Sequence, residues 1–93
     1  MRIEWLPIAD RDRASQLAYL TARSPKAALA MGDAIDAAVV RLALHPYSAR
    51  QGRVAGTREL VVPRTPYLIV YRIEQAAVVI LRMLHGAQDW PSS

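Results

Sequence analysis

The chain has 93 residues, no cysteine and a formal net charge of +4 at pH 7. This length suits one small domain, residues 1–93, in which folding buries only somewhat over ~60% of the surface that the unfolded chain exposes. The lack of cysteine excludes a disulfide framework and a thiolate metal site, and it makes the reducing cytoplasm the natural compartment. No apolar run approaches the ~20 residues of a membrane span, and the N-terminus lacks the layout of a signal peptide, so we expect a soluble protein with no membrane partner.

Arginine dominates the charge, since eleven arginines and one lysine stand against eight acidic residues. This balance suits an anionic partner, either nucleic acid or an acidic polypeptide. The abundance of alanine and the single lysine also indicate a compositional bias that favours arginine everywhere. The positions of the arginines are therefore more informative than their number.

The first half of the chain predicts a strand and two helices. Arg2–Leu6 alternates apolar and polar residues with the period of a strand, and Pro7 ends it. Pro7–Ala22 is expected to form a helix, because apolar and small residues recur there at three- and four-residue spacing. Ser24-Pro25 is typical of a helix start, and the second helix runs until His45-Pro46 ends it. Helices joined by about two residues form an antiparallel hairpin.

The second half predicts a sheet. Pro46–Thr57 has no sustained period and contains glycines and arginines, which indicates a basic loop. Arg58–Val62, Tyr67–Ile73 and Ala77–Leu84 are rich in branched and aromatic residues and should form a three-stranded antiparallel meander. Val78–Leu81 is apolar throughout, which indicates a central strand. The predicted class is α+β, with the helical hairpin packed on one face of the sheet.

Three arginines occupy strand positions, where guanidinium groups could clamp phosphates or carboxylates. They are Arg58, Arg72 and Arg82. Each also has a structural interpretation: Arg72 lies in solvent at a hairpin end, Arg58 pairs with Glu59 or Glu4, and Arg82 fixes the C-terminal tail through Asp89. The sequence leaves these alternatives open.

His85 directly follows the last predicted strand, and its ordinary pKa near ~6.5 suits a general acid or base at neutral pH. No serine, aspartate or second histidine is placed to form a triad with it, and His45 is better explained by a helix C-terminus. No two residues have the spacing of metal ligands. We therefore expect no metal and no cofactor.

The aromatic residues offer surfaces on which bases could stack, but most fit the core better. Trp5 lies in a strand, and Tyr67 and Tyr71 occupy alternate positions, which is typical of packing on one sheet face. Trp90 is different because it lies beyond the last strand. Its side chain either packs back onto the domain or is presented to a partner.

Several motifs of the second half resemble the toxins of the RelE/ParE superfamily. They are Gly56-Thr57-Arg58-Glu59-Leu60, then Tyr67-Leu68-Ile69-Val70-Tyr71-Arg72, then Val78 through Leu84 followed by His85-Gly86-Ala87. The order of predicted elements agrees with that superfamily over nearly the whole chain. The resemblance implies the toxin of a bacterial type II toxin-antitoxin module, on a plasmid or a chromosome, held inactive by a cognate antitoxin that wraps it in a hetero-oligomer.

The superfamily has two branches, and two positions favour one of them. RelE-like toxins cut mRNA on the ribosome and typically have an arginine where this chain has Leu68, and a tyrosine near the C-terminus where it has Trp90. A tryptophan cannot supply a phenolic proton. The resemblance is therefore nearer to the ParE-like branch, which is associated with poisoning of DNA gyrase.

On the ParE-like interpretation no residue is expected to be catalytic, and six side chains are expected to bind the target or the antitoxin. These are Arg53, Arg58, Arg72, Arg82, His85 and Trp90. The alternative is a ribosome-dependent endoribonuclease in which Arg58, Arg82 and His85 bind and protonate around the scissile phosphate. A third alternative is a degenerate binding module without toxicity.

Overall fold

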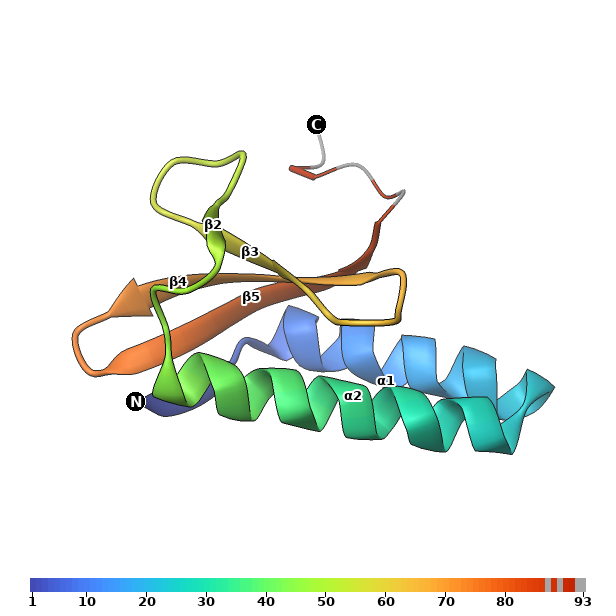
Figure 1. Ribbon diagram of the computed structural model, residues 1–93. Coiled ribbons are helices and arrows are strands. Elements are labelled where there is room, and N and C mark those ends of the chain that lie inside the picture. Colours follow the sequence, from blue (N-terminus) through green and yellow to red (C-terminus); the bar gives the residue numbers. More distant parts are fainter. Residues whose placement is uncertain (87, 89, 92–93) are drawn as a thin grey trace.

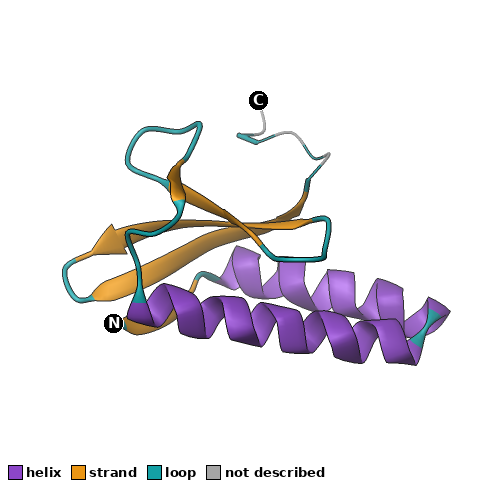
Figure 2. Ribbon diagram, viewed as in Figure 1, coloured by secondary structure: helices purple, strands orange, loops and turns teal. Residues whose placement is uncertain are grey.

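The computed structural model describes residues 1–86, 88, 90 and 91. The elements in chain order are β1 (Arg2–Trp5), α1 (Pro7–Arg23), α2 (Pro25–Leu44), β2 (Arg50–Gln51), β3 (Arg58–Val61), β4 (Tyr67–Glu74) and β5 (Ala77–His85). Both helices lie on the same side of the sheet (Figures 1 and 2), as the sequence predicts.

Local capping explains the sharp helical hairpin. The backbone N–H of Ser24 donates to the carbonyl oxygen of Leu20 and closes α1, while its side-chain oxygen accepts a 3.1 Å hydrogen bond from the N–H of Ala27 and opens α2. Proline occupies the start of each helix, where no intrahelical donor is lost. At the far end, His45 caps α2 and donates its N–H to the carbonyl oxygen of Arg41, which confirms its predicted role.

The sheet has five strands in the order β1-β5-β4-β3-β2. The predicted antiparallel meander of β3, β4 and β5 is confirmed, but the whole sheet is mixed because β1 pairs with β5 in parallel, from Arg2 opposite Ala77 to Trp5 opposite Ile80. The expectation of an unpaired loop was wrong at Arg50 and Gln51, which form β2 against β3. Both residues are exposed, so β2 has no alternating pattern that would have predicted it.

Strand β5 is central, as the apolar run predicts. It lies between β1 and β4, and Val78, Val79 and Ile80 are buried. Its register against β4 shifts next to Val70 and Tyr71, which face Arg82 and Ile80, so Leu81 is an extra residue on β5. This bulge lies where β1 ends, and it separates the inner half of β5 from the half that carries Arg82.

Side chains of the sheet alternate between two apolar layers. Tyr67, Ile69 and Tyr71 face the helices and join the main core with Met31, Ile35 and Leu42 of α2. Leu68, Val70 and Leu84 form a smaller cluster on the opposite face, where Leu81 and Trp90 pack against them. Tyr67, Tyr71 and Trp5 therefore serve the core, as predicted. Across the described part of the chain, no helix has the length and apolar character that a membrane crossing requires.

Candidate functional site

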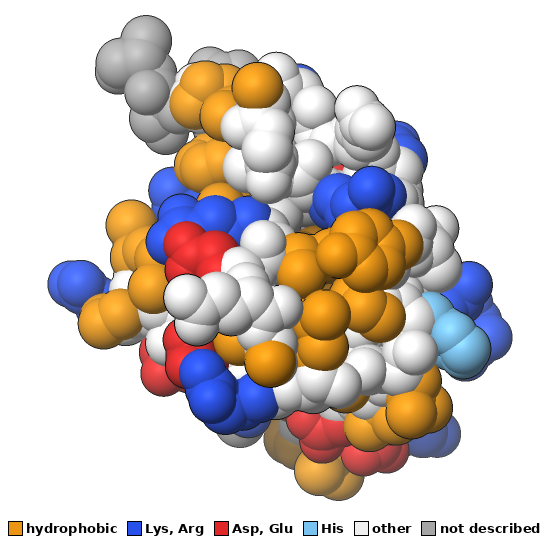
Figure 3. Space-filling view, turned by 90° about the vertical axis from the view of Figure 1, so that its left-hand side faces the viewer, with side chains coloured by type: hydrophobic (Ala, Val, Ile, Leu, Met, Phe, Trp, Pro, Cys, Tyr) orange, Lys and Arg blue, Asp and Glu red, His pale blue; other side chains and the backbone are white. Residues whose placement is uncertain are grey.

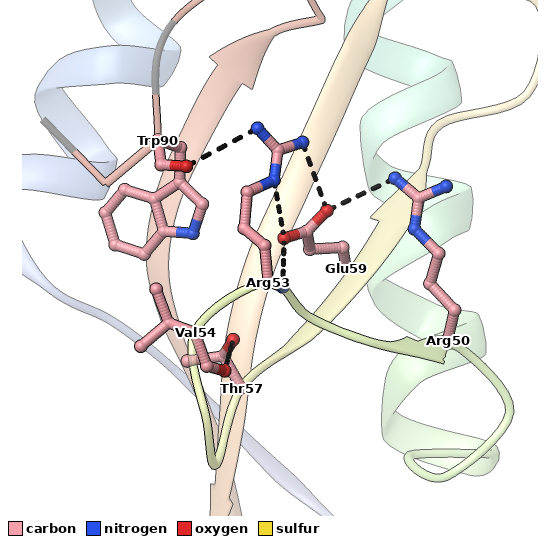
Figure 4. Close-up of polar contacts among 6 residues, drawn as sticks. All are labelled: Arg50, Arg53, Val54, Thr57, Glu59 and Trp90. Atoms are coloured by element: carbon pink, nitrogen blue, oxygen red, sulfur yellow. Dashed lines mark hydrogen bonds and ion pairs between the residues drawn. The ribbon is translucent and has the colours of Figure 1, made fainter.

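A buried carboxylate organises the arginines of the β2–β3 region (Figure 4). Glu59 is only 3% exposed, and it accepts hydrogen bonds from the backbone N–H of Arg53 at 3.0 Å and from the Arg53 side chain at 3.2 and 3.3 Å. Arg50 donates a further bond at 3.2 Å. Burial by itself raises the pKa of Glu59, but the hydrogen bonds from Arg53 and Arg50 outweigh it and leave the pKa below its ordinary value. Glu59 thus fixes the loop to the sheet as a carboxylate.

Arg53 also reaches the C-terminal segment. Its Nη1 donates to the carbonyl oxygen of Trp90 over 3.5 Å, a long contact. The Trp90 ring lies on the helix-free face of the sheet against the cluster that includes Leu68 and Val70, so it packs back onto the protein. Its indole Nε1 is buried and has no hydrogen-bond partner among the described residues. Arg53 and Trp90 are the two predicted site residues that the structure brings together.

Arg58 serves the connection that follows α2. Its Nη1 donates to the carbonyl oxygens of Tyr47 at 3.2 Å and Ala49 at 2.7 Å, so the suggested pairing with Glu59 or Glu4 is wrong. In the same turn the hydroxyl of Tyr71 donates to the carbonyl oxygen of Pro46 at 2.6 Å. Burial raises the pKa of Tyr71, while the charge of Arg58 and a backbone hydrogen bond with Ala49 act in the opposite direction.

Arg82 is held by α1. Its Nε and Nη2 donate to the two carboxylate oxygens of Asp12 at 2.8 and 3.1 Å, and the backbone N–H of Met83 donates to the same carboxylate at 3.0 Å. Beyond the end of β1, no strand of the described residues pairs with this edge of β5, and the Asp12 carboxylate accepts the N–H of Met83 there. The suggested pairing of Arg82 with Asp89 falls on a residue outside the described part of the chain.

The remaining two candidates lie at opposite ends of the β4–β5 hairpin. Arg72 pairs with Glu74 at 2.6 Å, and both side chains are about half exposed, as expected for a hairpin end. His85 lies opposite Tyr67, and the two rings meet edge to face with centroids 5.8 Å apart. The backbone N–H of His85 donates to Oε1 of Gln88 at 2.7 Å.

Arg58, Arg82 and His85 do not converge. Arg58 is opposite Tyr71 and His85 opposite Tyr67, on the two neighbouring strands of β4. Four residues of strand separate the backbone positions of Arg58 and His85 by roughly 13 Å along β4, and two strand spacings add roughly 10 Å across the sheet. Arg82 lies three residues before His85 on β5, but its guanidinium is bound to Asp12. Among the described residues there is also no group of three or more acidic or histidine side chains that could hold a metal ion.

A groove beside α2 was missed by the sequence interpretation. It has a volume of about 620 Å³ and lies between α2, which contributes Ala27, Ala30, Ala34 and Ala37, and the β3–β4 turn, residues 63–67. Asp33 and Arg64 give it one acidic and one basic group. The recurrence of alanine at three- and four-residue spacing was the available signal, because such short side chains do not fill the space between the helix and the turn.

Comparisons with known proteins agree with this geometry. A chain described as belonging to the chromosomal ParDE toxin-antitoxin system of P. aeruginosa superposes with a TM-score of 0.80, covering 91% of this chain and 95% of that one at 24% sequence identity. The two chains thus share one fold. A family model described as the ParE toxin of the type II toxin-antitoxin system parDE matches residues 3–90, and the chain belongs to this family.

Two relatives have similar sequences along most of their length. Y4kP of Sinorhizobium fredii, a protein named as a toxin, is 42% identical over 90 residues, which cover 97% of this chain and 93% of the relative. Toxin RelE1 of Caulobacter vibrioides is 33% identical over 85 residues, covering 87% of this chain and 88% of the relative. The expected superfamily and its ParE-like branch are confirmed.

Proposed function

We propose that this ParE-family toxin acts by binding a protein target, DNA gyrase, and that a cognate antitoxin neutralises it. The observation that carries the proposal is the dispersal of Arg58, Arg82 and His85 over the sheet. In-line attack of a ribose hydroxyl on its phosphate needs a base, an acid and cations around one phosphate. Because Arg58 and His85 lie on different strands, four residues apart along β4, they do not supply a cation and an acid or base to one phosphate.

The internal contacts of the arginines support the same conclusion. Arg82 gives two donors to Asp12, and Arg58 gives Nη1 to two backbone carbonyls. Leu68, where RelE-like ribonucleases typically have an arginine, is buried on the helix-free face. Removing one stabilising or proton-transferring group commonly costs ~10²-fold or more in rate, so little ribonuclease activity is expected.

For target binding we propose Arg53 and Arg72, whose side chains are 43% and 41% exposed, together with Arg58, while Arg82 contributes through the edge that Asp12 orders. Trp90 is proposed as a contact beside Arg53, and His85 as a contact at the end of β5. These residues lie well apart from one another, which fits a protein partner better than a small substrate.

For the antitoxin we propose the groove between α2 and the β3–β4 turn. Its small side chains allow close approach of another backbone, its lining is mostly apolar, and Asp33 and Arg64 give a partner segment one fixed charge of each sign to match. A smaller hollow of about 140 Å³, lined by Arg41 and Leu60 among others, continues it along α2. An amphipathic segment that fills both would cover the apolar surface.

The test compares two assays on the same purified toxin. We expect inhibition of gyrase supercoiling, or accumulation of cleaved DNA complexes, and no codon-specific cleavage of mRNA on programmed ribosomes. Because glutamine keeps a polar side chain for a target contact but cannot transfer a proton, His85→Gln should leave growth arrest largely intact. Co-expression of the antitoxin should relieve the arrest. Efficient ribosome-dependent cleavage that is lost in His85→Gln would refute the proposal and favour the ribonuclease. Normal growth at confirmed expression of the toxin would argue against toxicity itself.

A further inference from the structure

A small hollow lies at the end of the molecule where α2 finishes and the β2–β3 loop turns back. Its volume is about 290 Å³, and it is bordered by Tyr47, Gln51, Gly52, residues 54–57, Arg58 and Ile73. Figure 3 views the molecule from the side where α2 ends and shows hydrophobic side chains next to those of arginines. The hollow is separate from the groove proposed for the antitoxin, since the two share no lining residue.

Arg58 lines this hollow, and only one of its three guanidinium nitrogens makes hydrogen bonds to described residues. Both of its hydrogen bonds, to the carbonyl oxygens of Tyr47 and Ala49, use Nη1. Nε and Nη2 have no hydrogen-bond partner among the described residues. These two nitrogens form the edge of the guanidinium that matches the two oxygens of a carboxylate. The carbonyl contacts therefore fix the orientation of the group while leaving a bidentate edge available.

The surroundings of Arg58 are also rigid. Its guanidinium carbon lies 5.3 Å from the centre of the Tyr47 ring, which is itself 65% exposed. The loop across the hollow is closed by a 2.8 Å hydrogen bond from the N–H of Gly52 to the carbonyl oxygen of Thr57, and a side chain at Gly52 would collide with Thr57. A ligand would thus meet donors that are already in place, which reduces the entropic cost of binding.

The local charge balance distinguishes Arg58 from its neighbours. Glu59 lies within ion-pair distance of both Arg50 and Arg53. No carboxylate of the described residues lies within ion-pair distance of Arg58, so its charge is left for an external anion. A single guanidinium with tyrosine, valine and isoleucine beside it suits one carboxylate on an otherwise apolar segment. A nucleic-acid backbone would call for several cations in a row.

We propose that the Arg58–Tyr47 hollow binds an aspartate or glutamate side chain of a partner polypeptide, with the carboxylate on Nε and Nη2 of Arg58 and adjacent apolar groups against Tyr47. This deepens the proposed function, because it names the chemistry of one contact at a surface assigned there to the target. The binding itself can be measured without gyrase or an antitoxin.

The experiment is an NMR titration of the intact chain with N-acetyl-glutamate N-methylamide. The neutral control is N-acetyl-glutamine N-methylamide, and dimethyl phosphate tests the phosphate alternative. We expect saturable shifts of the Arg58 side-chain N–H and of the amides of residues 52–58, with a Kd on the order of millimolar. The neutral probe should cause no saturable shift, and dimethyl phosphate should bind more weakly than the carboxylate.

Variants locate the site. Arg58→Lys keeps the charge but loses the bidentate edge, and should weaken binding about tenfold, the effect of a lost charge-assisted hydrogen bond. Tyr47→Leu should also weaken it, and this variant retains the backbone carbonyl that orients Arg58, so the fold is not at risk. Arg72→Lys, at an exposed arginine outside the hollow, is the matched control and should bind as the parent does.

Three results would overturn the proposal. The first is that the glutamine probe causes shifts equal to those of the glutamate probe. The second is that dimethyl phosphate binds more tightly than the carboxylate. The third is that the Tyr47→Leu and Arg58→Lys variants are both folded and both bind the carboxylate as tightly as the parent. A titration of the parent without saturable carboxylate shifts would likewise refute this proposal, yet it would not bear on whether the toxin inhibits gyrase or binds an antitoxin. Failure of gyrase inhibition, in turn, would leave the titration valid.

Discussion

Two arginine–acid pairs of similar length but different burial allow a direct measurement of what the Asp12 contact contributes. Arg82–Asp12 spans 2.8 Å with side chains 20% and 15% exposed, whereas Arg72–Glu74 spans 2.6 Å with side chains 41% and 52% exposed. The first joins α1 to β5, and the second stays within one strand. The perturbation is Asp12→Ala, and Glu74→Ala is its control.

The magnitude follows from the bonds that are lost. Asp12 accepts two hydrogen bonds from Arg82 and one from the N–H of Met83, a residue that is 0% exposed. Hydrogen bonds to charged groups contribute about 1.5–3 kcal/mol each, but water reaches part of the guanidinium and reduces the sum. A net loss of about 3 kcal/mol is expected, which corresponds to a drop in Tm of roughly 12–24 °C for a protein of this size.

The assay is thermal and urea unfolding of four proteins: the parent, Asp12→Ala, Arg82→Ala and the double variant. Because Met83 still bonds to Asp12 in Arg82→Ala, that variant should lose less than Asp12→Ala, and the cycle should give a coupling of about 2 kcal/mol. Glu74→Ala should cost below about 1 kcal/mol. Equal losses for Asp12→Ala and Glu74→Ala, or a coupling near zero, would refute the assignment of Asp12 as the partner of this strand edge.

Three further outcomes are expected. The pKa of Glu59 is lowered in the folded state, so its contribution to the stability of the fold is present above the ordinary value of 4.5 and is lost as the pH falls below it. The difference in unfolding free energy between the parent and Glu59→Gln should therefore shrink on acidification. A difference independent of pH would contradict this. Since the indole N–H of Trp90 has no partner among the described residues, Trp90→Phe should cost clearly less stability than Trp90→Ala, which urea midpoints will check. Saturating antitoxin should raise the Tm of the parent and of Leu29→Ala, because Leu29 is an exposed residue of α2 outside the groove. It should not raise the Tm of Ala37→Trp, because the large side chain would obstruct the groove. An unchanged Tm of the parent would count against antitoxin binding.

The sequence predicted the elements with a strong period and missed what depends on distant pairing. Alternation and apolar runs located β3, β4 and β5, and the capping residues located both helices. The parallel pairing of β1 with β5 left no local signal in the sequence, because it depends on where the two helices and the later strands place β5 relative to β1. Strand β2 has two exposed residues, too few for a period to be visible.

The candidate site shows the same division. Arginines at strand positions were recognised, but their partners were not. Asp12 is 70 residues from Arg82 in sequence. Arg58 bonds to backbone carbonyls, which every residue carries, so the residue types gave no indication of this contact. The role of Glu59 as the acceptor for Arg50 and Arg53 depends on its burial, which follows from tertiary packing. The family could be identified from short motifs because these motifs form β3, β4 and β5 and are therefore visible in the sequence without knowledge of distant contacts.

The parallel pairing of β1 with β5 also determines when the chain can finish folding during its synthesis. Strand β1 leaves the ribosome before the other strands of the sheet and pairs with β5, so β1 has no strand partner until β5 has emerged, although α2 can already pack against β4. Closing such a long loop is slow compared with forming helices or hairpins. A nascent chain that stalls before β5 lacks the central strand on which α1 packs, and it therefore cannot present the assembled surfaces of the toxin.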